Sequence, residues 1–330
     1  MINQRKRRNF VFAFMMSFAL ILAGCGSASP AGTPTPTPPL QTSSPEASPS
    51  ETPSVPSPIR VTDSRGVEVV LEKAPENVIS LLPSDTEILY ALGAGDLVTA
   101  VSEYCNYPEA TASKEKLATG EKLSVEALIE KKPDVVFLGA MSSSSDQIAQ
   151  LESAGVKIIV TEANSLEETY QVISMMGAAL GKEEAAEQMV LAIKTGLEDI
   201  RKSSEGKTAK TVFIEVSPLQ YGLWTCGTGT FIQELLEYVG AKNIFADLSG
   251  WASVSEEQVL SANPDFIITT ASPLTGIEDP IGDITGRTGW DVLTAVKEKQ
   301  VYMLDGDMLS RPGPRLLDAA GELKKILYGE

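Results

Sequence analysis

The sequence contains no histidine and three cysteines, which limits the chemistry open to it. Histidine is the commonest general base and metal ligand, so its absence removes Ser-His-Asp triads, the usual zinc hydrolase sites and histidine-ligated metal centres. Cys25, Cys105 and Cys226 do not have zinc-site spacing, and the sequence does not decide whether Cys105 and Cys226 form a disulfide. No nucleophile–base pair supports an enzyme, and no calcium-loop spacing stands out, although the composition leaves sites of Asp and Glu alone open for hard cations. We therefore expect a protein that is not an enzyme, with no catalytic residue and no metal site.

Carboxylates recur at matching places in two halves of the chain. Segment 124–134 carries Glu126 and Asp134 and segment 255–265 carries Glu257 and Asp265, with one offset for both pairs (257 − 126 and 265 − 134 are both 131). A second repeat places Glu87 before Gly93-Ala94 and Glu234 before Gly240-Ala241. Two repeats in the same order predict two lobes of similar topology.

The N-terminus has the layout of a secretory signal. Basic residues 5–8 precede an apolar run over 10–22, and small residues lead to Cys25. The run is shorter than the ~20 residues that span a bilayer, which disfavours a permanent transmembrane helix. The ending Leu-Ala-Gly-Cys at 22–25 resembles a bacterial lipobox, the alternative being an ordinary signal peptide with an incidental cysteine. We expect residues 1–24 to be a signal peptide and Cys25 to carry a lipid anchor.

Residues 25–58 after the cleavage site are dominated by Ser, Thr, Pro, Ala and Gly. Without apolar periodicity this segment cannot bury a core, so we expect a disordered tether, with folding from about Ile59. Residues 1–24 hold four basic and no acidic residues, so their removal changes the formal net charge from −17 to −21. Such an acidic chain argues against a nucleic-acid partner.

The rest of the chain alternates short β-branched runs with helical patterns, which predicts an α/β fold with parallel sheets. A helix over 84–92 ends at Gly93. The predicted strands cover 78–82, 134–138, 156–161, 210–216, 266–270 and 301–304.

A long helical stretch separates the two groups of strands. Ser165 and Glu168 form a capping-box pattern, followed by helices toward Leu180 and over 183–202. Because no Gly-Ser hinge interrupts it, we expect a rigid spine. The predicted domains are an N-terminal lobe (59–164), a helical connector (165–206) and a C-terminal lobe (207–330).

Five segments carry a resemblance to a known family: 80–87, 102–108, 128–134, 251–258 and 310–315. From about Arg60 to the C-terminus, the chain resembles the substrate-binding proteins of ABC importers for vitamin B12, ferric siderophores and haem. Within this family, the Tyr-Cys-Asn-Tyr-Pro segment at 104–108 is most similar to the cobalamin-binding branch. The resemblance implies two lobes with a ligand cleft between them, in a monomer without a resident cofactor.

The resemblance also implies a contact with the membrane permease. One glutamate per lobe docks against permease arginines in the cobalamin receptor, and the matching positions are Glu126 and Glu257. The alternative is a pair of solvated surface glutamates. Glu87 and Glu234 are a competing pair, which we expect on the helix surface or near the cleft.

The implied ligand site lies between the lobes, where aromatic walls would hold a large, partly apolar ligand. We expect Arg311 to bind a propionamide or phosphate edge and Asp307 to accept amide hydrogens. For Tyr107 and Trp224 the alternative is core packing, and we expect Cys105 to be a packed residue near the site. The candidate ligand-binding residues are Tyr104, Trp251, Asp307, Met308 and Arg311, then Pro83, Tyr107, Tyr221 and Trp224.

Some positions depart from the cobalamin receptor. Small residues around Gly120 and Gly139 stand where it has tryptophans, and Met308 replaces an aromatic residue. These differences favour a wider cleft, a different corrinoid or a siderophore.

The sequence therefore predicts an extracytoplasmic lipoprotein that captures a corrinoid, either cobalamin or cobinamide, for an ABC permease and its ATPase. A ferric siderophore or haem is the nearest alternative solute, with Tyr104 or Tyr107 available as a haem ligand. The alternative from another class is an exported sensor or docking protein without transport.

Overall fold

The computed structural model describes residues 57–139 and 142–329. Within this range the N-terminal half contains a five-stranded parallel sheet in the order β5-β4-β3-β6-β7. An antiparallel hairpin of β1 and β2 precedes it. The elements are β1 (Ile59–Thr62), β2 (Glu68–Leu71), β3 (Val78–Ser80), α1 (Pro83–Ala91), β4 (Val98–Ser102), β5 (Glu115–Leu117), α2 (Val125–Glu130), β6 (Val135–Leu138), α3 (Ser145–Ser153) and β7 (Ile158–Val160).

The C-terminal half contains a four-stranded parallel sheet in the order β10-β8-β12-β13, and a separate antiparallel ribbon of β9 and β11. Together the two parallel sheets confirm the predicted α/β class. The elements are β8 (Thr211–Glu215), β9 (Trp224–Cys226), α6 (Phe231–Tyr238), β10 (Lys242–Asn243), β11 (Trp251–Ser253), α7 (Glu256–Ala262), β12 (Phe266–Thr269), α8 (Pro280–Thr285), α9 (Thr294–Lys297), β13 (Val301–Met303) and α10 (Gly306–Ser310).

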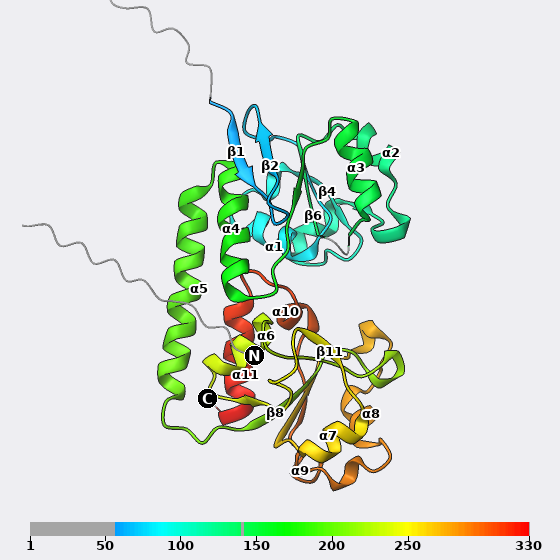
Figure 1. Cartoon of the computed structure of the whole chain (residues 1–330), viewed down its shortest axis with the longest axis vertical. Helices are drawn as coiled ribbons and strands as arrows, with labels where there is room; N and C mark the ends of the chain where they lie inside the picture. The colour runs from blue at the N-terminus through cyan, green and yellow to red at the C-terminus, as the bar shows by residue number, and fades with distance from the viewer. Residues whose placement is uncertain (1–56, 140–141, 330) are drawn as a thin grey trace, which may run out of the picture. The chain divides into compact units, whose positions relative to one another are not determined.

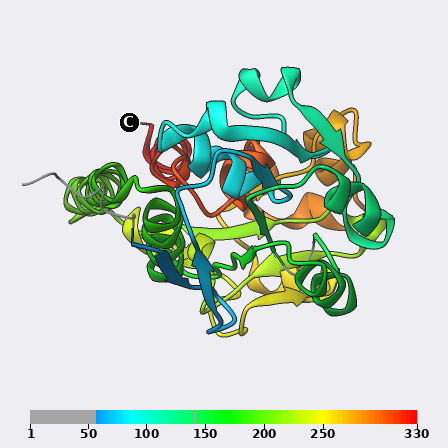
Figure 2. The ribbon, with the colours of Figure 1, turned by 90° about the horizontal axis from the view of Figure 1, so that it is seen from above.

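Two long helices, α4 (Leu166–Leu180) and α5 (Glu183–Ser204), connect the two sheets, and α11 (Leu316–Tyr328) packs against α5 (Figure 1). Viewed end-on in Figure 2, α4 and α5 run side by side at the edge of the sheets. The Ser165–Glu168 capping box is present at the start of α4. Gly177 permits the close contact between α4 and α5, because a Cβ there would lie 2.5 Å from the Cβ of Ala186.

Each predicted strand is present but one to three residues shorter. These strands are apolar throughout because alternate residues point to opposite faces of the sheet, and both faces are buried. Val135 and Phe137 of β6 join one hydrophobic cluster, whereas Val136 and Leu138 join another.

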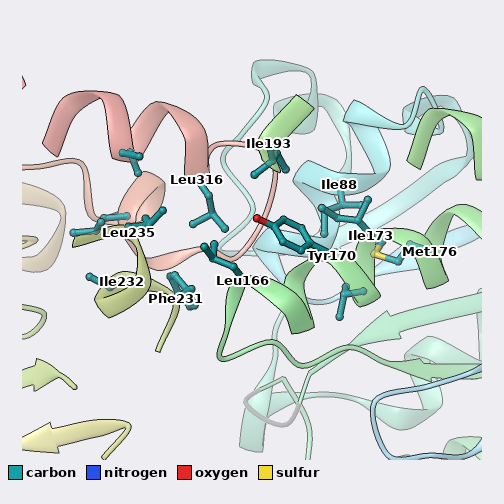
Figure 3. Close-up of a cluster of buried hydrophobic side chains, with 14 of the residues drawn as sticks. Ile88, Leu166, Tyr170, Ile173, Met176, Ile193, Phe231, Ile232, Leu235 and Leu316 are labelled. Carbon is teal, nitrogen blue, oxygen red and sulfur yellow. The ribbon is translucent and has the colours of Figure 1, made fainter. Parts of the chain in front are cut away.

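One of these clusters is shared by both lobes and the connecting helices. It includes Ile88 of α1, Ile173 and Met176 of α4, Phe231 and Leu235 of α6, and Leu316 of α11 (Figure 3). Smaller clusters cover the opposite face of each sheet. Hydrophobic packing therefore runs without a break from one lobe to the other.

The repeated aspartates have the same structural role in both halves. Asp134 accepts hydrogen bonds from the backbone N–H groups of Glu76 and Asn77 (2.8 and 2.9 Å), immediately before β3. Asp265 accepts from the N–H and hydroxyl of Thr211 (2.9 and 2.8 Å), the first residue of β8. Each carboxylate thus ties the start of its own strand to that of the neighbouring strand, which explains one part of the repeat.

Several predictions fall on residues that the structure does not describe. The signal peptide, Cys25 and nearly all of the 25–58 tether lie outside the described residues. Among the described helices, none is long and apolar enough to cross a membrane. Cys105 and Cys226 are described, and both are buried free thiols.

Asp85 in α1 is a buried carboxyl whose hydrogen bond comes from the hydroxyl of Thr161. Burial raises the pKa of Asp85 to about 7. Between about pH 4 and pH 7 the folded state therefore retains a proton that the unfolded state has lost. The contribution of Asp85 to stability falls as the pH rises through this window.

We expect Asp85→Asn to raise the free energy of unfolding at pH 8 by on the order of 2–4 kcal/mol, with little change at pH 4. The amide cannot ionise and can still bond to Thr161. Urea unfolding at both pH values measures the effect. Asp134→Asn is the matched control, and we expect it to lower the free energy of unfolding. The reason is that backbone N–H donors, chiefly that of Glu76, lower the pKa of Asp134. An equal gain from Asp85→Asn at both pH values would contradict the assignment.

Candidate functional site

A cavity of about 390 Å³ lies between the two lobes. The wall that the N-terminal lobe contributes is formed by residues that follow the carboxyl ends of β3, β6 and β7. This is the usual place for ligands in parallel α/β sheets. Its C-terminal walls come from α6, β11 and the end of α10. The lining residues are Leu82, Pro83, Ser84, Gly139, Thr161, Glu162, Ala163, Asn164, Phe231, Trp251, Ser310, Arg311 and Pro312.

Two aromatic side chains form the C-terminal wall of the cavity. Trp251 packs edge-on against Phe231, with ring centroids 5.7 Å apart and an angle of 67° between the rings. Phe231 is buried, whereas Trp251 is 38% exposed. An indole held by a buried ring but open on one side is suited to contact a flat ligand.

Trp224 extends this aromatic surface along the β9–β11 ribbon. Trp224 pairs with Ser253, and Cys226 pairs with Trp251. Because paired residues point to the same face and alternate residues share it, the two tryptophans lie on one face of the ribbon. Trp224 does not line the cavity itself, but it is exposed and is not a core residue.

The candidate tyrosines lie outside the cavity lining. Tyr104, Tyr107 and Tyr221 are exposed, Tyr104 by 64%. The guanidinium of Arg315 lies 4.4 Å from the ring centroid of Tyr107, which fixes that ring by a cation–π contact. Met308 is partly buried against the shared hydrophobic cluster. Of the candidates, Pro83, Trp251 and Arg311 are therefore brought together in the cavity.

Arg311 lines the cavity, but both of its terminal nitrogens donate to protein acceptors. Nη1 donates to Glu87 Oε1 (2.9 Å) and Asn106 Oδ1 (2.8 Å). Nη2 lies 2.7 Å from Asp307 Oδ1 and donates to the carbonyl of Tyr104 (3.3 Å). Arg311 and Asp307, predicted as separate ligand contacts, are thus paired with each other and with the N-terminal lobe.

Glu87 lies at the centre of this network and not on the helix surface. Its side chain is buried, and its Oε2 and Oε1 atoms accept from Nε and Nη2 of Arg315 (2.8 and 2.6 Å). The surface part of our expectation was therefore wrong, because two arginines from the C-terminal lobe cover the carboxylate. The partners are 224 and 228 residues away in the chain, so sequence periodicity gives no sign of them.

Glu234, the repeat counterpart of Glu87, also reaches across a boundary between elements. From α6 it accepts a hydrogen bond from the backbone N–H of Leu166 at the start of α4 (2.7 Å). Burial raises the pKa of Glu234. Glu87 therefore connects the two lobes, and Glu234 connects the C-terminal lobe to the helical connector.

Glu126 and Glu257 are exposed, and they belong to the short helices α2 and α7, which lie on different lobes (Figure 1 shows the two helices). Each is the second residue of a short helix, α2 or α7, whose N-cap is Ser124 or Ser255. A hydrogen bond from the Ser255 hydroxyl lowers the pKa of Glu257. The two carboxylates are available to a partner that contacts both lobes.

Phe231 was not among the residues predicted for the site. The second repeat contained a signal for it, because the 147-residue offset between Glu87 and Glu234 also aligns Phe231 with Ser84 (234 − 87 and 231 − 84 are both 147). Both residues lie in the first turn of the repeated helix, and both line the cavity.

The buried thiols are poor nucleophiles. Burial raises the pKa of Cys226 to about 12 and also raises the pKa of Cys105, whose sulfur lies 3.1 Å from the Thr86 hydroxyl. Over residues 57–139 and 142–329, no group of three or more His, Cys, Asp or Glu side chains is placed to hold a metal ion.

Comparison with known proteins gives a family match over residues 78–308, to the family described as periplasmic binding protein. The uncharacterised ABC transporter substrate-binding lipoprotein YvrC of Bacillus subtilis is 38% identical over 277 residues, which are 82% of this chain and 86% of YvrC. A vitamin B12-binding protein of Vibrio cholerae is 30% identical over 250 residues, 75% of this chain and 87% of the relative.

Two solved structures are also similar. The vitamin B12-binding protein BtuF of Vibrio cholerae has a TM-score of 0.64 at 29% identity, covering 77% of this chain and 96% of BtuF. A possible iron-binding, periplasmic solute-binding protein of Staphylococcus epidermidis has a TM-score of 0.68 at 33% identity, covering 78% of this chain and all of the other.

We expect Phe231→Ala to lower the free energy of unfolding by about 3–5 kcal/mol and to shift tryptophan emission to longer wavelength. The substitution removes a buried ring and the support of Trp251. Phe266→Ala is the control, because Phe266 is also buried but stacks on Tyr302. Chemical unfolding and fluorescence spectra measure both effects, and an equal spectral shift in the control would contradict the role of Phe231.

Proposed function

The chain belongs to the periplasmic binding protein family, and we propose that the solute it captures is a corrinoid, either cobalamin or cobinamide. The family relationship makes it a substrate-binding protein of an ABC importer and not an enzyme. The corrinoid assignment goes further, and it rests on the cavity together with the B12-binding relatives.

The observation that carries the proposal is the aromatic wall of the cavity. Trp251, braced by Phe231, offers a flat apolar surface, and Pro83 lies on the opposite lobe. A corrin macrocycle is broad, mostly apolar on its faces and amide-bearing at its edge. A cavity with apolar walls and a few polar groups suits such a ligand. Similarity to the Vibrio cholerae B12-binding protein supports the same solute.

A ferric chelate is the second candidate, because the Staphylococcus epidermidis relative is named as a possible iron-binding protein. Anionic chelates are well bound by arginine and lysine side chains. Among the described residues that line the cavity, Arg311 is the one basic side chain, and its terminal nitrogens bond to protein groups. This arrangement favours the corrinoid.

We expect cyanocobalamin or dicyanocobinamide to quench the tryptophan fluorescence of the protein saturably. Trp251→Ala should weaken corrinoid binding at least tenfold, because it removes the cavity wall. Since this variant loses a fluorophore, calorimetric titration measures its affinity. Trp224→Phe is the control, because it keeps a ring at a position outside the cavity lining. Saturable binding of a ferric siderophore and no corrinoid would overturn the assignment.

The docking proposal rests on Glu126 and Glu257. We propose that these carboxylates bind arginines of the permease in its complex with the ATPase, while Cys25 carries the lipid anchor of a monomeric protein. The equivalent exposed positions at the N-termini of α2 and α7, one on each lobe, support it, because exposed carboxylates pair well with arginine side chains.

Reversing both charges, with Glu126→Lys and Glu257→Lys, should abolish uptake and leave corrinoid affinity within twofold, because neither residue lines the cavity. Uptake of labelled corrinoid by cells and calorimetric titration measure the two effects. Glu130→Lys is the matched control, since Glu130 is exposed on the same helix α2. Normal uptake by the doubly reversed protein would remove the docking role, and lost solute affinity would place these residues in the binding site.

A further inference from the structure

The cavity borders an ion network with more carboxylates than guanidinium groups. Glu87, Asp305 and Asp307 face Arg311 and Arg315. Asn106 joins the network through Asp307 Oδ2, to which its side-chain N–H donates at 2.6 Å. Three negative charges against two positive charges leave this side of the cavity with an acidic balance.

Arg311 is the member of the network that reaches the cavity. A guanidinium there would be the natural partner for a carboxylate of an incoming solute, because its planar fork matches carboxylate geometry. Glu87, Asp307, Asn106 and the Tyr104 carbonyl already accept from its terminal nitrogens. An anionic solute that binds both terminal nitrogens would have to displace one of these acceptors.

Glu87 and Asp307 differ in how readily water could replace them. Glu87 is 2% exposed, so its displacement would strand a carboxylate in the interior at a high desolvation cost. The Asp307 side chain is 38% exposed and can be solvated. Glu87 therefore stays paired with Arg311 while it shares its charge with Arg315, and Asp307 supplies a second, more exposed carboxylate to Arg311.

We infer that Glu87 determines the charge class of the solute, so that the cavity admits a neutral or cationic macrocycle and rejects polyanionic chelates. Glu87 acts by selection against competing solutes, because it pairs with the cation that an anionic competitor would need. The inference rests on the proposed function only in taking this cavity as the solute site. Glu87 thus selects the solute by charge in addition to joining the lobes.

The internal repeat supplies a matched control for Glu87. Glu234 occupies the equivalent helix position and also links separate elements, but it accepts its hydrogen bond from the Leu166 backbone N–H. Glu234→Gln therefore perturbs a link between elements without removing a carboxylate from an arginine. Glu87→Gln removes the buried charge that is paired with Arg311 and keeps a similar side-chain volume.

The test titrates the purified protein and both variants with haemin and ferric citrate as anionic probes, and with cyanocobalamin as the probe without net charge. Glu87→Gln should raise affinity for the anionic probes at least tenfold, and added salt should weaken this new binding. The affinity for the anionic probes should therefore rise relative to the affinity for cyanocobalamin. Glu234→Gln should gain nothing for the anions. If Glu87→Gln does not fold, as judged by circular dichroism, Asp307→Asn replaces it, with a smaller gain expected.

Two results would overturn the inference. One is a folded Glu87→Gln protein with no gain for either anionic probe, and the other is equal gains in Glu87→Gln and Glu234→Gln. The first result, together with corrinoid binding by the unmodified protein, would leave the proposed function standing. A gain for anions in a protein that binds no corrinoid would support the charge selection and reject the proposed solute.

Discussion

The shared hydrophobic cluster is the constraint on which the rest of the structure depends. One face of each parallel sheet packs into it, as do α4, α5 and α11. Because protein interiors are close-packed, large rotations of one lobe against the other would open voids in this cluster. The cavity is therefore held between two sheets whose separation is set by side-chain packing.

The ion network around Glu87 lies on this framework and depends on it. A buried carboxylate between two guanidiniums is tolerable only with good geometry, because desolvation of the ions opposes their attraction. α1 supplies Glu87 from one lobe, and the end of α10 and the start of α11 supply Arg311 and Arg315 from the other. Packing of these helices brings the charges together, and the charges in turn fix the segment that carries Tyr104 and Tyr107.

The sequence was sufficient to predict elements whose signal is local. Strands with both faces buried are continuous apolar runs, and Ser165 and Glu168 mark the start of α4 within four residues. The repeats also predicted the second lobe. Pairings between distant residues were beyond reach, since nothing near Glu87 specifies an arginine more than 200 residues away. The cavity lining was likewise only partly predictable. Trp251 was predicted from its motif, but its contact with Phe231 depends on how β11 packs against α6.

The shared cluster also bears on how the chain folds. Two sheets of similar topology suggest two independent folding units, yet each sheet leaves one apolar face to be covered by the common cluster. A lobe cut free at the connector would expose that face to water, with a loss of about 25 cal/mol for each Å² uncovered. The chain therefore has two lobes by topology, but we expect it to unfold as a single cooperative unit, because neither half holds a complete core.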